Sequence, residues 1–310
     1  MYKIIGADQK EYGPVSADQI NAWILEGRAN GQTQVQPEGS AEWRPLSTFP
    51  EFAGVFAAKA ATATSLSPDV FTRDYDFEIG GCIGRGWELV KNNFGLVLGA
   101  TAIFMAIQIG MFVTSQIPIL GILISMGSLV ISGPLKGGFY CFLLKLLRAR
   151  PAEVGDIFAG FRLCFVQLML GYIVMFLLAG LSAIPGAVVM GFALIPFLRS
   201  HQLDPASAAI GAVGAVILLI PLVFLSVTWI FSLPLIIDKQ VDFWTGMETS
   251  RKTVWKHWWK VFGLLLVGGL LTVAGVLVCC VGALVTMPIA LGSIMYVYET
   301  IFGARPTPSA

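Results

Sequence analysis

The pattern of hydrophobic and polar positions divides the chain into a mixed N-terminal part and a long apolar part, from about Asn93 to Gly303. The apolar part contains six stretches long enough to cross a bilayer as helices, which takes roughly 20 residues each. We place these stretches at residues 93–113, 119–147, 164–197, 208–237, 261–280 and 284–301. The pattern therefore predicts an all-α polytopic membrane protein with about six transmembrane helices.

An amphipathic segment precedes each pair of spans. Near the last pair, one helical face carries Phe243, Met247, Val254 and Trp258, and the other carries Glu248, Arg251, Lys252 and Lys256. Equivalent apolar stripes are Ile79, Ile83, Trp87 and Val90, and Val154, Ile157, Phe158 and Phe161. The first and third units also share a local pattern that starts at Trp87 and at Trp255. In each, a lysine or tryptophan follows four residues later, and a Phe-Gly pair comes shortly after it. The sequence thus predicts three units, each a helix lying on the membrane surface followed by a helical hairpin.

Prolines mark the expected irregularities of the second unit. Pro151 suits the first turn of its surface helix. We expect Pro185-Gly186 to break the third span, and Pro221 and Pro234 to kink or end the fourth. We also expect Gly110, Gly121, Gly268-Gly269 and Gly275 to allow close helix packing.

The N-terminal part has the pattern of a small α+β domain. Tyr2–Ile5 is a strand candidate, and Ser16 begins a capping box for a helix with Ile20, Trp23 and Ile24 on its apolar face. Short strands are expected at residues 33–35 and 43–46. We divide the chain into a cytoplasmic domain at 1–53, a flexible linker at 54–75, a membrane domain at 76–303 and a tail at 304–310.

The N-terminal domain resembles a GYF domain. The spacing of Gly13-Pro14-Val15, Ile20, Trp23 and Gly27 follows that signature, with Tyr12 before it and Trp43 and Pro45-Leu46 after it. The resemblance implies an aromatic groove that binds proline-containing peptides, formed here by Tyr12, Gly13, Pro14, Trp23 and Trp43. Val15 and Arg28-Ala29 replace aromatic residues of the signature. The alternative is that Trp23 and Trp43 form the core of the small domain.

The membrane part resembles the uncharacterised bacterial six-span domain that precedes some glycerophosphodiester phosphodiesterases. The resemblance covers roughly residues 76–303 and lies in Gly133-Pro134-Leu135, in Leu233–Asp238 and in the helix around Met247–Arg251. It transfers no catalytic residue.

The distribution of positive charge predicts an orientation. Basic residues flank one end of the spans, namely Arg85, Lys91, Lys145, Arg148, Arg150, Arg162, Lys239, Arg251, Lys252, Lys256 and Lys260. The opposite turns carry only Arg199. By the positive-inside rule, both termini and all three surface segments are cytoplasmic, in a bacterial inner membrane. The expected membrane-surface residues are Arg251, Lys252, Lys256, Trp258, Trp259 and Lys260.

Few residues suggest chemistry inside the spans. The 20 basic and 19 acidic residues nearly cancel, which argues against a nucleic-acid partner. No motif or cysteine spacing indicates an enzyme, a metal or a cofactor. We expect Lys136 to extend to the interface rather than to form a functional site. Asp238 with Lys239 is expected to be a plain helix terminus, or else to pair with the basic face Arg251–Lys256.

These features favour a non-enzymatic membrane scaffold whose N-terminal domain binds a partner peptide or cytoplasmic protein, with lipids as the second partner. The alternative is a small transporter, channel or lipid-handling protein.

Overall fold

The computed structural model describes residues 1–6, 11–25, 29–40, 42–56, 75–117, 120–200, 204–278 and 282–303. The chain forms two compact units, Met1–Pro68 and Asp69–Ala310, and each is described by itself. Gly27, most of the predicted linker and the tail at 304–310 lie outside the described residues.

The N-terminal unit is a four-stranded antiparallel sheet covered by a helix. Its strands are β1 (Tyr2–Ile5), β2 (Glu11–Val15), β3 (Gln34–Pro37) and β4 (Arg44–Pro45), in the order β2-β1-β3-β4. Helix α1 (Ala17–Leu25) follows β2, and the short 3-10 helix η1 (Leu46–Thr48) follows β4. Ser16 Oγ accepts the Gln19 N–H at 3.2 Å, as its place before the helix predicts. The core consists of Ile4, Val15, Ile20, Ile24, Ala29, Val35, Leu46 and Phe52.

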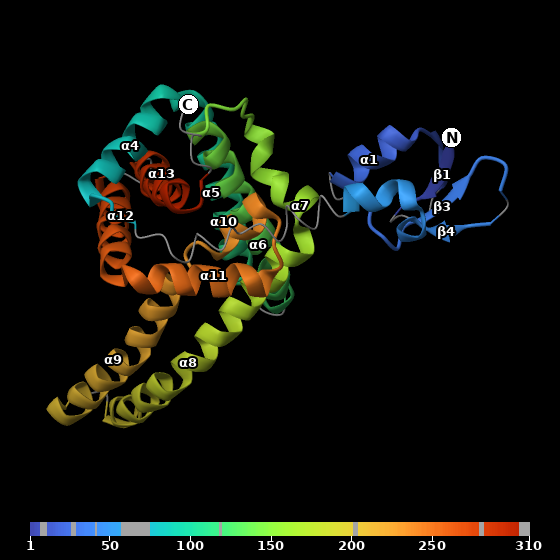
Figure 1. The fold of residues 1–310 in the computed structure, drawn as a ribbon. Helices are drawn as coiled ribbons and strands as arrows, with labels where there is room; N and C mark the ends of the chain where they lie inside the picture. Colours follow the sequence, from blue (N-terminus) through green and yellow to red (C-terminus); the bar gives the residue numbers. More distant parts are fainter. Residues whose placement is uncertain are drawn as a thin grey trace. The chain divides into compact units, whose positions relative to one another are not determined.

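The second unit is built entirely of helices among its described residues (Figure 1). The first pair of long helices is α5 (Phe94–Thr114) and α6 (Leu120–Leu147), preceded by α4 (Ile79–Asn92). The second is α8 (Phe165–Ser200) and α9 (Pro205–Thr228), preceded by η2 (Val154–Phe158) and α7 (Ala159–Leu163). Then follow α10 (Ser232–Lys239), α11 (Phe243–Lys256), α12 (Trp258–Val278) and α13 (Ala283–Phe302).

Six helical segments among the described residues are long and apolar enough to cross a membrane. In the most apolar stretch of α13, 56% of the residues are buried by the rest of the protein. In the corresponding stretches of α8 and of α9–α10, only 6% are buried. Helix α13 is therefore the central helix, whereas α8 and α9 form a long hairpin that extends away from the other helices (Figure 1). Most of the apolar residues of this hairpin are not buried. Helices of this length with exposed apolar side chains are stable in a lipid bilayer. The chain is therefore a multi-pass membrane protein with a small α+β N-terminal domain.

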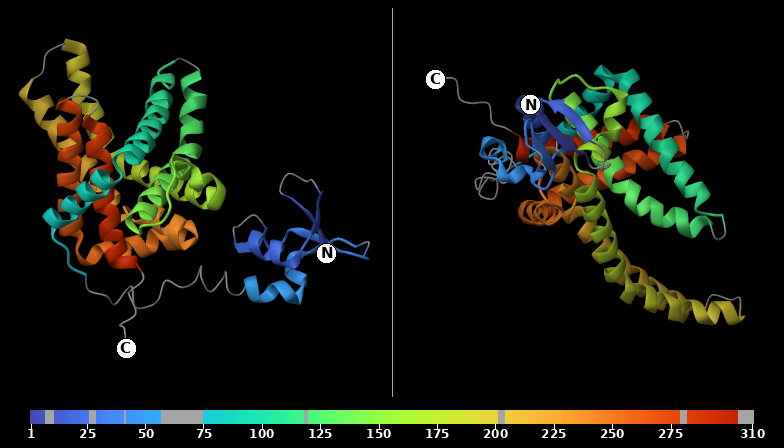
Figure 2. Two further views of the ribbon diagram at one scale, coloured as in Figure 1. Left: turned by 90° about the horizontal axis from the view of Figure 1, so that it is seen from above. Right: turned by 90° about the vertical axis from the view of Figure 1, so that its right-hand side faces the viewer.

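The three hairpins point in one direction. In the left view of Figure 2, the teal-green, yellow and red pairs all turn back at the upper side of the membrane unit. Helix α11 lies at the opposite side. Ion pairs agree with this arrangement, because Arg148 after α6 contacts Asp238 at the end of α10 and Glu299 near the end of α13. The returning helix of every hairpin thus ends at the same level.

The expected break at Pro185-Gly186 was wrong. Helix α8 runs through both residues and through Pro196 without interruption. A Cβ on Gly186 would lie under 3.0 Å from the backbone nitrogen of Leu218, so the glycine brings α9 against α8 at this point. Close packing of a neighbouring helix is one of the conditions under which a membrane helix tolerates a proline.

The predicted fourth span is instead interrupted before Pro234, at residues 229–231 between α9 and α10. Ser250 of α11 bridges this interruption, because its Oγ donates to the Thr228 carbonyl at 2.8 Å and accepts the Phe231 N–H at 3.2 Å. The third residue of α10 is Pro234. It lacks the backbone N–H that would be needed to continue the helical hydrogen bonds from α9. A buried hydroxyl therefore satisfies the backbone groups that the break leaves open.

The second amphipathic segment is not a single surface helix. Pro151 lies outside any helix, and the segment consists of the 3-10 helix η2 and the five-residue α7. Its start is a capping box in which Glu153 and Asp156 each accept a backbone N–H of the other. Two glycines, Gly138 of α6 and Gly160 of α7, let this segment pack directly against the backbone of α6. A Cβ on Gly138 would lie under 3.0 Å from the Ile157 carbonyl oxygen, and a Cβ on Gly160 equally close to the Pro134 carbonyl oxygen.

The other two amphipathic helices pack against protein on their inner faces. In α4 the buried residues are Cys82, Gly86, Leu89 and Val90, whereas Trp87, from the predicted apolar stripe, is 48% exposed. Gly86 sets this rotation, because a Cβ there would collide with the Ile289 carbonyl of α13. In α11, Met247 and Val254 of the predicted apolar face are buried against α10 and its neighbours rather than turned to the membrane surface. The small residues Gly246, Thr249, Ser250 and Thr253 are buried with them.

Candidate functional site

The edge strand β2 carries the first group of predicted peptide-binding residues. Tyr12, Gly13 and Pro14 are all exposed, and the Tyr12 side chain is 46% exposed. Tyr12 pairs with Ile4 across the β1–β2 ladder, so it lies on the same face of the sheet as the buried Ile4. Val15, which stands where the GYF signature has an aromatic residue, points into the core with 7% exposure.

The two tryptophans occupy different parts of this domain. Trp23 of α1 is half-buried and packs against the core that Ile4, Ile20 and Ile24 form. Trp43 is also half-buried and directly precedes β4, the edge strand opposite β2. Three strand spacings of roughly 4.8 Å separate the two edges, or about 14 Å. Tyr12–Pro14 and Trp23 therefore lie on two consecutive elements, β2 and α1, whereas Trp43 lies at the opposite edge of the sheet, beside β4.

A pocket of about 340 Å³ lies beside Pro14. Residues from β1, β2 and the turn after β3 line it, including Tyr2, Lys3, Pro14 and Pro37. Gly39 adopts a φ of 90° in that turn, a left-handed conformation that favours glycine. The Tyr2 ring packs edge-on against Phe52 at 5.7 Å, and its hydroxyl donates to Glu51. A shallow concave surface thus adjoins the exposed end of β2.

The predicted membrane-surface residues gather where α11 meets α12. Trp255, Lys256, Trp258, Trp259 and Lys260 line a pocket of about 590 Å³ with Ile220 and Phe224 of α9. Trp259 is 77% exposed, while Trp258 is half-buried and stacks on Phe262 at 5.2 Å. Aromatic rings beside lysines are typical of the bilayer interface.

Acidic partners neutralise part of this surface. Arg251 donates to Glu248 at 2.7 and 2.8 Å, and Lys252 lies 3.3 Å from the same carboxylate. The hydrogen bond from Arg251 is the main reason why the pKa of Glu248 falls to about 2. Lys260 pairs with Asp76, just before α4. The cations of α11 are thus held in place on an exposed face.

A partly buried charge cluster joins the returning helices of all three hairpins. The Arg148 guanidinium donates to both oxygens of Asp238, at 2.5 and 3.0 Å, and to Glu299 Oε2 at 2.8 and 3.0 Å. Tyr298 donates its hydroxyl to Asp238 at 2.9 Å, and Lys239 lies 3.4 Å away. The hydrogen bonds to Asp238, and then to Glu299, raise the pKa of Arg148 despite its burial. Both expectations for Asp238, a plain helix end or a pairing with Arg251–Lys256, were wrong.

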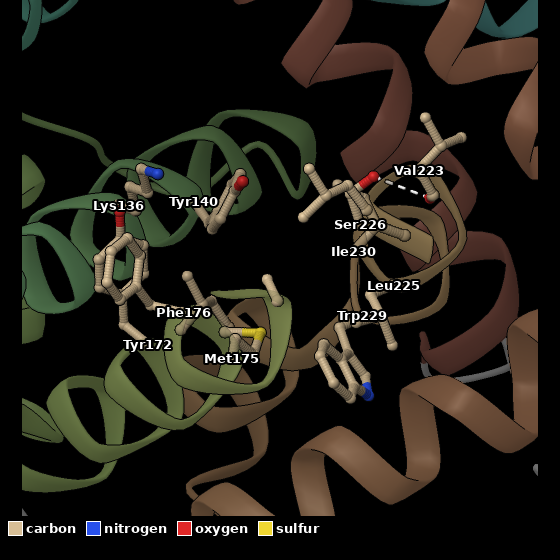
Figure 3. Close-up of a pocket in the computed structure, with 13 residues that line it drawn as sticks. Lys136, Tyr140, Tyr172, Met175, Phe176, Val223, Leu225, Ser226, Trp229 and Ile230 are labelled. Atoms are coloured by element: carbon tan, nitrogen blue, oxygen red, sulfur yellow. Dashed lines mark hydrogen bonds between the residues drawn. The ribbon is translucent and has the colours of Figure 1, made fainter. Parts of the chain in front are cut away.

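A second polar feature lies between α6, α8 and α9. Figure 3 shows Lys136, Tyr140 and Tyr172 along one wall of a pocket, facing Leu225, Ser226 and Trp229 across it. The pocket has a volume of about 490 Å³. The ammonium group of Lys136 lies 4.7 Å from the centre of the Tyr172 ring, a cation–π contact.

Sequence reasoning missed both of these features. The partners of Arg148 lie 90 and 151 residues away along the chain, so no local motif connects them. The one sign of this cluster in the sequence was that Arg148, Asp238 and Glu299 all stand at the charged ends of predicted spans. For Lys136, the signal was a single cation inside an otherwise apolar stretch, where an ionisable side chain is a candidate functional residue.

The fold and these sites define a class: a multi-pass membrane protein that carries a small peptide-binding domain. The chain belongs to the family described as Domain of unknown function (DUF7847), whose model matches residues 77–308. Residues 4–52 match GYF domain 2, so the N-terminal unit is a GYF domain. No curated protein and no solved structure matched the chain.

Proposed function

We propose that this protein is a non-enzymatic membrane adaptor that holds a peptide-binding GYF domain at the inner face of a bacterial cytoplasmic membrane. The observation that carries the proposal is the presence of a GYF domain and a six-span domain in one chain. GYF domains bind proline-rich segments, whose polyproline II helix is already formed and loses little entropy on binding. The exposed Tyr12 and Pro14, beside the concave surface at Pro14, supply the recognition surface.

The orientation follows from charge and from the common direction of the hairpins. The returning helices end together at Arg148, Asp238 and Glu299, and the basic α11 lies at that same side. Positive charge concentrates on the cytoplasmic side of membrane proteins. Both termini are therefore cytoplasmic, and the surface of Trp255, Lys256, Trp259 and Lys260 faces the anionic inner leaflet.

We expect Tyr12→Ala to weaken the binding of a fluorescent oligoproline peptide by about tenfold, the loss that removal of one aromatic anchor causes at an interface. The measurement is fluorescence anisotropy on the full chain in lipid nanodiscs. Tyr12 is the informative position because its ring is exposed, whereas Trp23 packs against the core and its removal would also report on folding.

Arg44→Ala is the matched control. Arg44 is exposed on the opposite edge strand and pairs only locally with Glu42. We expect this variant to bind like the unmodified protein. Equal affinity of the unmodified chain for oligoproline and for an alanine-glycine peptide would contradict the proposed specificity.

A further inference from the structure

The pocket around Lys136 opens onto the lipid-facing surface of the membrane unit. Phe176 and Val223, on two of the helices that form it, are 52% and 36% exposed. Because α8 and α9 bury so little of their apolar windows, acyl chains of the bilayer surround this rim. The remaining wall is mostly aliphatic and aromatic, including Met175, Leu222 and Leu233. A hydrocarbon chain can enter this pocket without crossing water.

Lys136 is the one cationic side chain in the lining of this pocket. Eleven residues separate it from the end of α6 at Leu147, about 16 Å along the helix axis. Among the residues that the structure describes, no carboxylate forms an ion pair with Lys136, and its ammonium group lies over the Tyr172 ring. By contrast, Lys145 on the same helix pairs with Asp156 at 2.7 Å. A cation in such surroundings favours an anionic ligand.

The other polar groups of the pocket restrict the ligand to a small headgroup. The Ser226 hydroxyl already donates to the Val223 carbonyl at 2.9 Å. The phenol groups of Tyr140 and Tyr172 lie on the same wall as Lys136, as Figure 3 shows, and each can donate one further hydrogen bond. One ammonium group and two phenols suit a single carboxylate. A glycerophosphate headgroup would require more polar partners than this wall carries.

We propose that this pocket binds a long-chain fatty acid. Its carboxylate pairs with the ammonium group of Lys136, and its chain lies along Met175, Phe176 and Leu222 toward Trp229. The volume of about 490 Å³ falls within the range of pockets that hold one small amphipathic ligand. This site is independent of peptide binding, and it would make the membrane domain lipid-handling in addition to being an anchor.

The test uses the full chain in nanodiscs of zwitterionic phosphatidylcholine, with a brominated long-chain fatty acid as the probe. Bromine quenches the fluorescence of nearby tryptophans. The part of the quenching that is lost in the Trp229→Phe variant comes from Trp229 and therefore reports on this pocket. We expect saturable quenching of Trp229, weakened at least tenfold by Lys136→Gln and retained by Lys136→Arg. Lys252→Gln, which removes a cation from the exposed face of α11, is the control and should bind like the unmodified protein.

Three results would overturn the proposal. The first is equal binding by Lys136→Gln, with unchanged thermal unfolding of that variant. The second is equal quenching by the uncharged methyl ester of the fatty acid, which would indicate annular lipid only. The third is complete displacement of the probe by an anionic phospholipid present at a similar concentration, which would assign the pocket to a phospholipid.

Discussion

Replacing Arg148 by methionine is expected to lower the free energy of unfolding in detergent micelles by about 3 kcal/mol, the lower end of the loss when one partner of a buried ion pair is removed. The side chains of Arg148, Asp238 and Glu299 are 20%, 9% and 27% exposed, so water replaces the lost partner only in part. Glu299 would then lose its partner Arg148, and Asp238 would retain Lys239, which lies 3.4 Å away. Reversible unfolding in a denaturing detergent, followed by tryptophan fluorescence, measures the change.

Two further variants separate this effect from a general loss of charge. Arg251→Met removes an exposed ion pair with Glu248 and is expected to lose less than about 1 kcal/mol. The triple variant Arg148→Met, Asp238→Asn, Glu299→Gln should recover much of the loss, because no unpaired charge remains buried. If Arg148→Met unfolds with the same midpoint as Arg251→Met, the cluster does not hold the three hairpins together.

The second large effect is expected at Gly138, where Gly138→Ala should destabilise the membrane domain by about 2 kcal/mol. A Cβ there would lie under 3.0 Å from the carbonyl oxygen of Ile157, which is backbone and cannot rotate away. Helix α6 would have to separate from η2 and α7, which would also strain the ion pair between Lys145 of α6 and Asp156 of η2. The same unfolding measurement applies.

Gly127→Ala is the matched control on the same helix. A Cβ at Gly127 would meet nothing within 4 Å, so the substitution removes only the flexibility of glycine. We expect a gain of about 0.5 kcal/mol, opposite in sign to the effect at Gly138. Destabilisation of similar size at both positions would show that helix propensity, rather than the close contact with Ile157, determines the result.

The architecture was predictable because its signals are local. Runs of apolar residues and the charges between them located every span to within a few residues, apart from the interruption between α9 and α10. The capping residue Ser16 and the apolar positions Ile20 and Ile24 likewise predicted α1. These features depend on neighbours along the chain, and their physical cause is visible in the sequence.

Contacts between distant elements were not predictable in this way. Gly268 and Gly275 approach α13 closely as expected, at Ala290 and Thr286, whereas Gly121 approaches Ser115 near the turn of its own hairpin. Gly110 and Gly269 face open space, and the tight contacts at Gly86 and Gly138 were missed. A glycine has the same letter whether it faces lipid or another backbone. The hydroxyl of Ser250, which bridges the break before α10, also gives no sign of its role in a helix that reads as simply amphipathic.

The most direct test of the account is the membrane topology, measured with a membrane-impermeant maleimide on intact cells. Single cysteines would stand at Gln116, in the turn after α5, or at Ala206, in the first turn of α9, both of which are exposed. A third single-cysteine protein would retain Cys279, which follows α12 in the sequence. The comparison positions are Glu42 in the GYF domain and Lys252 on α11, each in a background without other cysteines. We expect labelling at positions 116, 206 and 279 in intact cells, and at Glu42 and Lys252 only after lysis. Labelling of Lys252 in intact cells, or protection of any of the three turns, would contradict it.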